Sequence, residues 1–236
     1  MFKFISSFVT LALFIGSFNA KATTINFSTA LPAGHQGESV TVGGITASAW
    51  IVSKADGTSW ISNGVILNNR QEGPSELGLG VCVPTTATPC PATGSGNINE
   101  IDNNGSTFEV IQLDFGVATR VNSIGLSSLD SGLKDGFAIF EGNTATPNLS
   151  LMTPLVQGTN QSVGSVEPII PVNQTFRYFF VTSMNRGIGS SGSDFLLESV
   201  TTTPEPYTSA MLGIGLLAIG ASLRLRVARQ RTKESK

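Results

Sequence analysis

The chain has 236 residues, of which 13% are charged, and its formal net charge at pH 7 is −2. Six basic and fourteen acidic residues lie between positions 23 and 203, which leaves this segment with a net charge of about −8. Nucleic acid is therefore excluded as an expected partner, because binding it needs clustered Lys and Arg. Divalent cations remain candidate partners, beside the simpler interpretation that the charge serves solubility.

The chain begins with the pattern of a secretory signal peptide. Lys3 precedes an apolar run over 4–18, and Ala20 and Ala22 follow in an A-x-A arrangement. A cationic start, an apolar stretch and small residues before the cut are the features of such a peptide. We expect residues 1–22 to be removed by cleavage after Ala22, because a cut after Ala20 would place a bulky phenylalanine three residues before it.

The body, predicted to be one domain over 23–200, consists of short strand-like segments. The expected strands are 25–28, 39–53 with a break at Gly43-Gly44, 59–69 with a turn at Asn63-Gly64, 107–116, 120–130, 136–143, 174–184 and 194–201. Turn residues separate these segments, and no stretch before Tyr207 shows a sustained helical period. Many short strands without helices between them predict an all-β fold, a single β-sandwich or jelly roll.

Two cysteines, Cys82 and Cys90, lie close together in the segment VCVPTTATPC. An exported chain reaches an oxidising compartment, where cysteines form disulfides. We therefore expect these two residues to be bridged. His35 is the only histidine, so a zinc site, which needs three or four ligands, is not expected.

The acidic turn EIDNNG, at 100–105, is a candidate calcium site. Calcium binds six to eight oxygen atoms, often from carboxylates and carbonyls, and Glu100, Asp102 and Asn104 would supply such atoms. The spacing differs from that of an EF-hand loop. The alternative is a turn whose Asp and Asn side chains bond their own backbone. Apart from this calcium, no cofactor is expected.

Catalysis is not expected of the body. A catalytic triad needs a base beside its nucleophile, and the single histidine lies in a turn-like Gly-Pro context. No G-x-S-x-G or H-E-x-x-H motif occurs. A polysaccharide-acting enzyme remains the alternative, which would present two carboxylates facing each other in a cleft.

A structural or binding role is therefore the leading expectation for the body. One form of it is a carbohydrate-binding module with aromatic side chains on one exposed face. The residues that would form this face are Trp50, Trp60, Phe137 and Phe140. The same residues would fit a hydrophobic core equally well, so the direction of the two tryptophans decides between these interpretations.

The last segment, 201–236, has three parts. A linker at 201–206 contains Pro204 and Pro206, which lack the N–H donor needed to continue a strand or helix. An apolar stretch over 207–223 reaches the lower end of the length that spans a bilayer. The tail over 224–236 is basic, with a cluster of Arg224, Arg226, Arg229 and Arg231. Positive charge beside a transmembrane helix stays in the cytoplasm, so the body is expected outside.

This tail resembles the PEP-CTERM sorting signal of Gram-negative bacteria, which is also catalogued as an ice-binding protein C-terminal domain. The residues that carry the resemblance are Pro204, Glu205, Pro206, the apolar segment and the arginine cluster. The resemblance implies recognition by an exosortase near Pro204–Pro206, with processing and export to the cell surface or extracellular polysaccharide matrix. The alternative is a permanent single-pass anchor that is never cut. Extracellular polysaccharide is then a candidate partner of the body.

Overall fold

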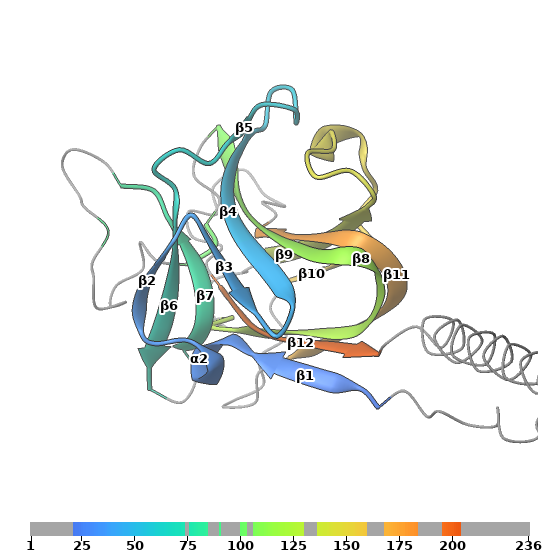
Figure 1. The fold of residues 1–236 in the computed structure, drawn as a ribbon. Helices are drawn as coiled ribbons and strands as arrows, with labels where there is room; N and C mark the ends of the chain where they lie inside the picture. Colours follow the sequence, from blue (N-terminus) through green and yellow to red (C-terminus); the bar gives the residue numbers. More distant parts are fainter. Residues whose placement is uncertain are drawn as a thin grey trace, which may run out of the picture. The chain divides into compact units, whose positions relative to one another are not determined.

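The computed structural model describes residues 21–73, 76–84, 90, 100–102, 106–129, 136–159, 168–183 and 195–203. Within this part of the chain, Thr23–Thr203 forms one compact unit, drawn in colour in Figure 1. Its buried apolar residues extend from Ile25 to Val200. The unit therefore contains its own core.

This unit is built on one antiparallel sheet of twelve strands. The strands are β1 (Thr23–Asn26), β2 (Gly34–Gly37), β3 (Ser39–Val42), β4 (Ile45–Ser53), β5 (Trp60–Ile61), β6 (Ile66–Glu72), β7 (Glu76–Cys82), β8 (Thr107–Ser127), β9 (Gly136–Gly142), β10 (Val156–Thr159), β11 (Ile169–Ser183) and β12 (Leu196–Thr203). Short helical turns occur at α2 (Phe27–Ala30) and in a 3-10 helix over Leu149–Leu151. The predicted all-β, sandwich-like fold is confirmed.

The sheet folds over on itself because β8 and β11 belong to both layers. The first part of β8, up to Asp114, pairs with β4 and with the second part of β11. The later part, from Thr119, pairs with the first part of β11 and, from Arg120, with β12. Gly116 has a φ of +72° between these parts, a conformation that glycine adopts without strain. The bend is visible in β8 in Figure 1.

The main core lies between the two layers. Ile111 and Leu113 point into it from the first part of β8, and Ile124 and Leu126 point into it from the second part. All four are fully buried. Each such side chain stabilises the fold by about 1.5–3 kcal/mol relative to its exposure. The alternation of inward and outward side chains follows from the two-residue period of a strand.

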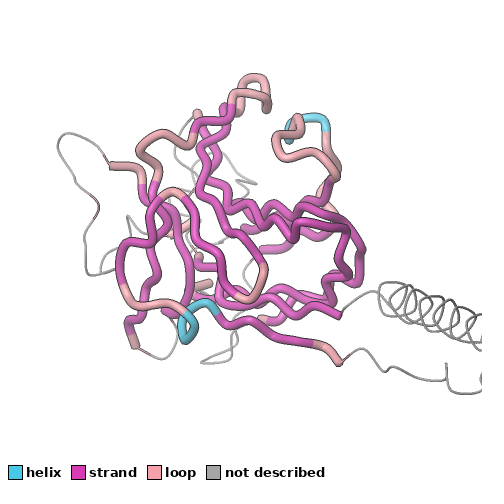
Figure 2. The backbone as a smooth tube through the Cα atoms, in the orientation of Figure 1, coloured by secondary structure: helices cyan, strands magenta, loops and turns pink. Residues whose placement is uncertain are grey.

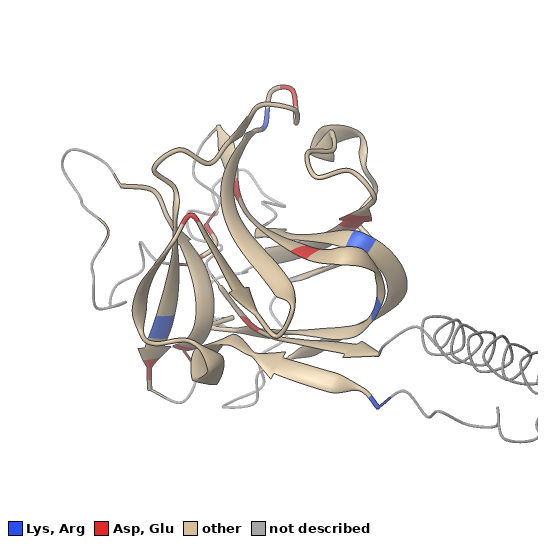
Figure 3. Ribbon diagram, viewed as in Figure 1, with Lys and Arg blue, Asp and Glu red and all other residues tan. Residues whose placement is uncertain are grey.

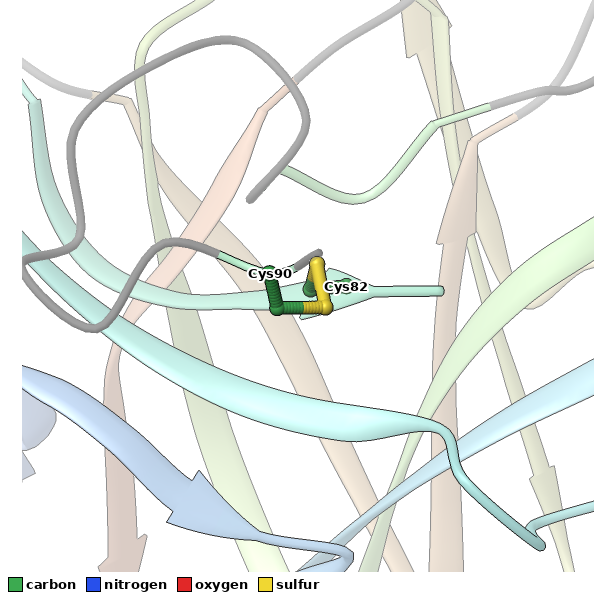
Figure 4. The surroundings of a disulfide bond; sticks show 2 residues. All are labelled: Cys82 and Cys90. Carbon is green, nitrogen blue, oxygen red and sulfur yellow. A yellow bond between two sulfur atoms is a disulfide. The ribbon is translucent and has the colours of Figure 1, made fainter. Parts of the chain in front are cut away.

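The expected disulfide is confirmed. Cys82, the last residue of β7, is bonded to Cys90, with 5.9 Å between their Cα atoms. Figure 4 shows the bridge at the end of this strand. It ties the chain that leaves β7 back to the sheet.

Several local expectations are confirmed and others are corrected. Gly43 and Gly44, both with positive φ, form the turn between β3 and β4, and Asn63-Gly64 forms a turn before β6. The expected strand 25–28 is wrong at its end, because the side chain of Asn26 accepts a 3.2 Å bond from Thr29 N and caps α2. The separate strands 107–116 and 120–130 are one strand, β8.

The expected signal peptide and sorting tail fall almost wholly at positions 1–20 and 204–236, outside the described residues. Among the residues that the structure does describe, no helix has the length and apolar character needed to cross a bilayer. Export and sorting therefore stay predictions at this point.

Candidate functional site

The sheet face that points away from the main core carries a second apolar cluster, called here the outer cluster. A sheet face that is not packed on the core is ordinarily polar and hydrated. The buried members of the outer cluster are Val52, Val110, Ala138, Phe140, Leu149, Tyr178 and Phe180, with Trp50, Trp60, Phe108 and Met152 partly buried against them. So much buried apolar surface on an outer face requires a covering segment.

Residues 143–155, between β9 and β10, supply this cover and are called here the cover loop. The side chain of Asn148 accepts a 3.0 Å bond from Ser150 N and begins the 3-10 helix, which is the cyan segment of this loop in Figure 2. Leu149 packs into the outer cluster, and its N–H donates to Gly57 O at 3.1 Å. At the end of the loop, Leu155 N donates to the backbone of β9. The cover loop is therefore fixed at its tip and at its end.

Trp50 and Trp60 lie half-buried beneath the cover loop. Their ring centroids are 5.7 Å apart in an edge-on arrangement. The indole N–H of Trp60 donates to Pro147 O in the loop at 3.0 Å. That of Trp50 donates to Gln112 Oε1 at 3.2 Å, and Gln112 in turn donates to Ala145 O. The two tryptophans therefore anchor the cover loop.

The four aromatic residues considered from the sequence are thus divided between two environments. Phe140 belongs to the outer cluster with Trp50 and Trp60. Phe137, with 2% of its surface exposed, belongs to the main core. Three of the four share one face, as a binding face requires, but the loop covers part of that face.

A cavity of about 310 Å³ lies where the cover loop meets the sheet. Its lining residues are Phe108, Phe140, Leu149, Ser150, Met152, Pro154 and Thr182. Ser150 is exposed at the rim, whereas Thr182 is 2% exposed. The hydroxyl of Thr182 donates to Glu109 O at 2.7 Å. Apolar contact and hydroxyl hydrogen bonding are thus the chemistry that this cavity offers.

One cation lies against the wall of the cavity. The Nζ atom of Lys54 is 5.2 Å from the centroid of the Phe108 ring, within the range of a cation–π contact. Partial burial lowers the pKa of Lys54, and the negative charge of Asp102 opposes that shift. Lys54 follows β4 directly and begins the turn that contains Gly57. This turn therefore places the charge of Lys54 and the backbone contact of Gly57 with the cover loop at the same end of the sheet.

A buried carboxyl group lies on the core side of β8. Glu109 has 6% of its surface exposed and accepts a 2.8 Å bond from Asp102 N. Burial raises the pKa of Glu109 from its usual 4.5 to about 8, an effect that the charge of Asp102 reinforces and the bond from the Asp102 N–H opposes. The side chain therefore holds a proton at neutral pH.

A buried positive charge lies in the hairpin of β6 and β7. Arg70 is 4% exposed and forms ion pairs with Glu72 at 3.0 Å, with Glu76, and with the buried Glu100. Figure 3 shows acidic and basic positions meeting on these two strands. Glu72 and Glu76 are directly opposite each other in the register. Arg70 thus offsets the repulsion of like charges at the end of the hairpin.

The calcium ligands expected from the sequence are only partly within the described residues. Glu100 directs its carboxylate to Arg70 and also accepts a 2.8 Å bond from Ser128 Oγ. Asp102 lies near Glu109, and Asn104 is outside the described residues. Within the described ranges, no three His, Cys, Asp or Glu side chains lie together as a metal site would need. The calcium site stays a prediction.

Of the other residues considered from the sequence, His35 and Ala22 lie in the part of the chain that the structure describes. His35 lies on β2, not in a loop, with its side chain exposed. Ala22, the expected cleavage position, directly precedes β1. The sorting residues Pro204, Glu205, Pro206, Arg224, Arg226, Arg229 and Arg231 are outside the described residues.

Sequence reasoning missed the cover loop and the cavity. The available signal was the segment 174–184, which is apolar on both faces. A strand that is apolar on both faces needs apolar cover on both faces. The space between the two layers covers only one of them, so another segment must cover the other.

Comparison with known proteins identifies no family. No family model matches the chain, and no curated protein matches it. Among solved structures, one match is a family 32 CBM from C. perfringens NanJ in complex with galactose, at 13% identity and a TM-score of 0.30. The match covers 72% of this chain and 98% of that module. A TM-score this low supports no inference about ligand or activity.

Proposed function

We propose that this chain is an exported surface or matrix protein whose body is a non-catalytic binding module, with the cavity under the cover loop as its ligand site. The observation that carries the proposal is the cavity of about 310 Å³ between sheet and loop. Ligand sites are concave and mostly apolar, with a few polar groups that orient the ligand. Phe108, Phe140 and Leu149 provide the apolar walls, and Ser150 and Thr182 provide the hydroxyl groups.

The cavity is also formed in advance of binding. The tip of the cover loop is bonded to Gly57, and its first part is bonded to Trp60 and Gln112. A ligand that enters a fixed site does not have to order the loop, so less of its binding energy is lost to conformational entropy.

The chemistry of the lining favours binding over hydrolysis. A glycoside hydrolase needs two carboxyl groups about 5–10 Å apart across the scissile bond. Here the lining side chains that the structure describes are apolar or carry a hydroxyl, while the carboxyl group of Glu109 lies on the core side of β8.

Export is supported independently by the disulfide between Cys82 and Cys90. Disulfides persist in oxidising compartments and are rare in the cytosol. We extend the proposal to the chain ends: residues 1–22 direct export, the segment 207–223 anchors the precursor, and an exosortase acts near Pro204–Pro206. The body then reaches the cell surface or matrix, where polysaccharide is its partner.

The proposal can be tested on the fragment 23–203, which contains the whole described core. The fragment is incubated with extracellular polysaccharide from the producing bacterium, and the bound fraction is measured by sedimentation. Ser150→Trp should close the cavity from its rim and reduce retention at least tenfold. Leu151→Trp is the matched control, because Leu151 is 83% exposed and directed away from the lining.

Equal retention of the two tryptophan variants and the parent would refute the cavity as the binding site. Release of reducing sugar from the same material would refute the non-catalytic assignment and favour a polysaccharide-acting enzyme. The Ser150→Trp and Leu151→Trp variants are first checked for cooperative thermal unfolding, so that loss of fold is not mistaken for loss of binding.

A further inference from the structure

The lining of the cavity also indicates which part of a ligand it holds. We infer that the cavity takes an alkyl or acyl chain of roughly ten carbon atoms, carried by a polar head that stays at the rim. This inference rests on the proposed function and names the ligand class for the same site. It differs from the simplest form of that function, in which a sugar ring itself would fill the cavity.

The described part of the lining carries few hydrogen-bonding groups. Among the residues that the structure describes, five of the seven that line the cavity are Phe108, Phe140, Leu149, Met152 and Pro154. A hexose carries several hydroxyl groups, and each one left unpaired in an apolar site weakens binding by roughly five- to a hundredfold. An alkyl chain has no such groups, so the lining suits it and does not suit a ring of hydroxyls.

Within the described lining, Thr182 carries the deep hydroxyl group. Thr182 is 2% exposed, and its hydroxyl already donates its hydrogen to Glu109 O at 2.7 Å. Toward a ligand it is therefore left with an acceptor lone pair only. Ser150, the other hydroxyl residue, is exposed at the rim. Polar recognition is thus concentrated at the mouth, where a head group would meet water.

The volume of the cavity sets the length of the chain that it can hold. An apolar cavity of about 150 Å³ holds benzene, which has six carbon atoms. A cavity of about 310 Å³ is twice as large and has room for roughly ten to twelve carbon atoms by that comparison. Met152, with its flexible and polarisable side chain, can adapt to chains of different length.

Two sources could supply such a chain: an acyl substituent on the extracellular polysaccharide, or a membrane lipid. The chemistry that enters the cavity is the same in both. Retention on polysaccharide that is lost after mild alkaline removal of ester-linked acyl groups would identify the first source. Retention on vesicles of phosphatidylethanolamine and phosphatidylglycerol, lost in Ser150→Trp, would identify the second.

The deciding experiment titrates the fragment 23–203 with n-alkyl glucosides and n-alkyl galactosides, from methyl to dodecyl, below their micelle-forming concentrations. Affinity should increase about three- to fourfold per added methylene and level off at roughly ten to twelve carbon atoms. The two sugar series should show the same slope. Ser150→Trp should weaken octyl glycoside binding at least tenfold, while Leu151→Trp should change it less than twofold.

An affinity that does not change with chain length would overturn the inference, whether or not it differs between glucosides and galactosides. An equal loss in both tryptophan variants would also overturn it, because the chain would then lie outside the cavity. If the alkyl glycosides show no chain-length effect but Ser150→Trp still reduces retention on matrix polysaccharide, the proposed function stands and the acyl-chain inference fails. If neither the chain-length effect nor the loss of retention is seen, both proposals fail.

Discussion

At the scale of single residues, the buried carboxyl of Glu109 should make the stability of the fold depend on pH. Its carboxyl is buried, and its folded-state pKa of about 8 lies above the usual 4.5. The folded state therefore holds a proton that the unfolded state releases between these two values. Stability should fall as the pH rises from about 4.5 to about 8, with a slope of at most about 1.4 kcal/mol per pH unit for one proton.

Glu109→Gln should remove this slope while it keeps an oxygen that accepts the bond from Asp102 N. The variant should match the parent below about pH 4, where Glu109 is protonated in both the folded and the unfolded state, and should exceed it in stability at about pH 8. Urea unfolding of both proteins across this range provides the measurement. A parallel pH dependence in parent and variant would show that another group causes it.

The acidic turn around Asp102 gives a second prediction at this scale. If calcium binds there, millimolar calcium should raise the melting temperature, because a ligand that binds only the folded state stabilises it. The shift should be absent in Asp102→Ala. The commitment of Glu100 to Arg70 leaves Asp102 and Asn104 as the side chains to contribute. An unchanged melting curve in the parent would leave this turn without a metal.

The sequence could not decide the direction of Trp50 and Trp60, because both a core and a binding face accept aromatic residues. Each indole forms its hydrogen bond with a partner far away in sequence: Trp60 with Pro147, and Trp50 with Gln112. Such pairings depend on how distant strands and loops come together. Local pattern contains no information about them.

At the scale of elements, the close approach of β7 and β12 depends on one glycine. Gly78 has a φ of +140°, and a Cβ atom there would lie 2.5 Å from Leu197 O. Gly78→Ala should therefore lower the free energy of unfolding by about 2–4 kcal/mol, through backbone strain and steric overlap. Gly73→Ala in the same hairpin is the control, because Gly73 also has a positive φ but open space around it.

Denaturant unfolding compares the open left-handed position of Gly73, at φ +64°, with Gly78, where the φ of +140° and the close contact act together. The control should show only the cost of the strained backbone, about 1 kcal/mol. Equal losses in the two variants would show that the contact with β12 contributes nothing beyond φ.

Local patterns predicted the elements that have strong turn signals. The two glycines between β3 and β4 and the Asn63-Gly64 turn were recognisable because their geometry is determined by a few neighbouring residues. The sequence did not indicate β10, whose four residues VQGT lack an alternating pattern, or β2, which contains two glycines. These strands form because they pair with the edges of β9 and β6. That pairing depends on the tertiary fold and cannot be recognised in the local sequence.

At the scale of the whole molecule, an all-β fold could be predicted because strand-like segments recur without helices between them. The bend of β8 could not, because a continuous strand that serves two layers has the same local pattern as two separate strands. The cavity also arises only at this scale. It requires a loop after β9 to lie over side chains from β8 and β11.

The two ends of the chain should both be removed by proteolysis during export. Mass spectrometry of the cell-surface and extracellular fractions should find a chain that begins at Thr23 and ends near Pro204–Pro206. Peptides from Leu223 onward should be absent from these fractions. Full-length protein confined to the inner membrane of a host with an exosortase would overturn the sorting proposal and favour a permanent anchor.

The pairing of the first and last strands has a mechanical consequence. Thr23 is opposite Thr202, and Ile25 is opposite Val200, while the other edge of β12 is bonded to β8. A pull on Thr203 along the strand would load the hydrogen bonds on both edges of β12 together, in shear, because these bonds run perpendicular to the strands. Rupture would require many bonds to fail at once. Tension applied at the end of β12 is thus resisted by hydrogen bonds on both of its edges.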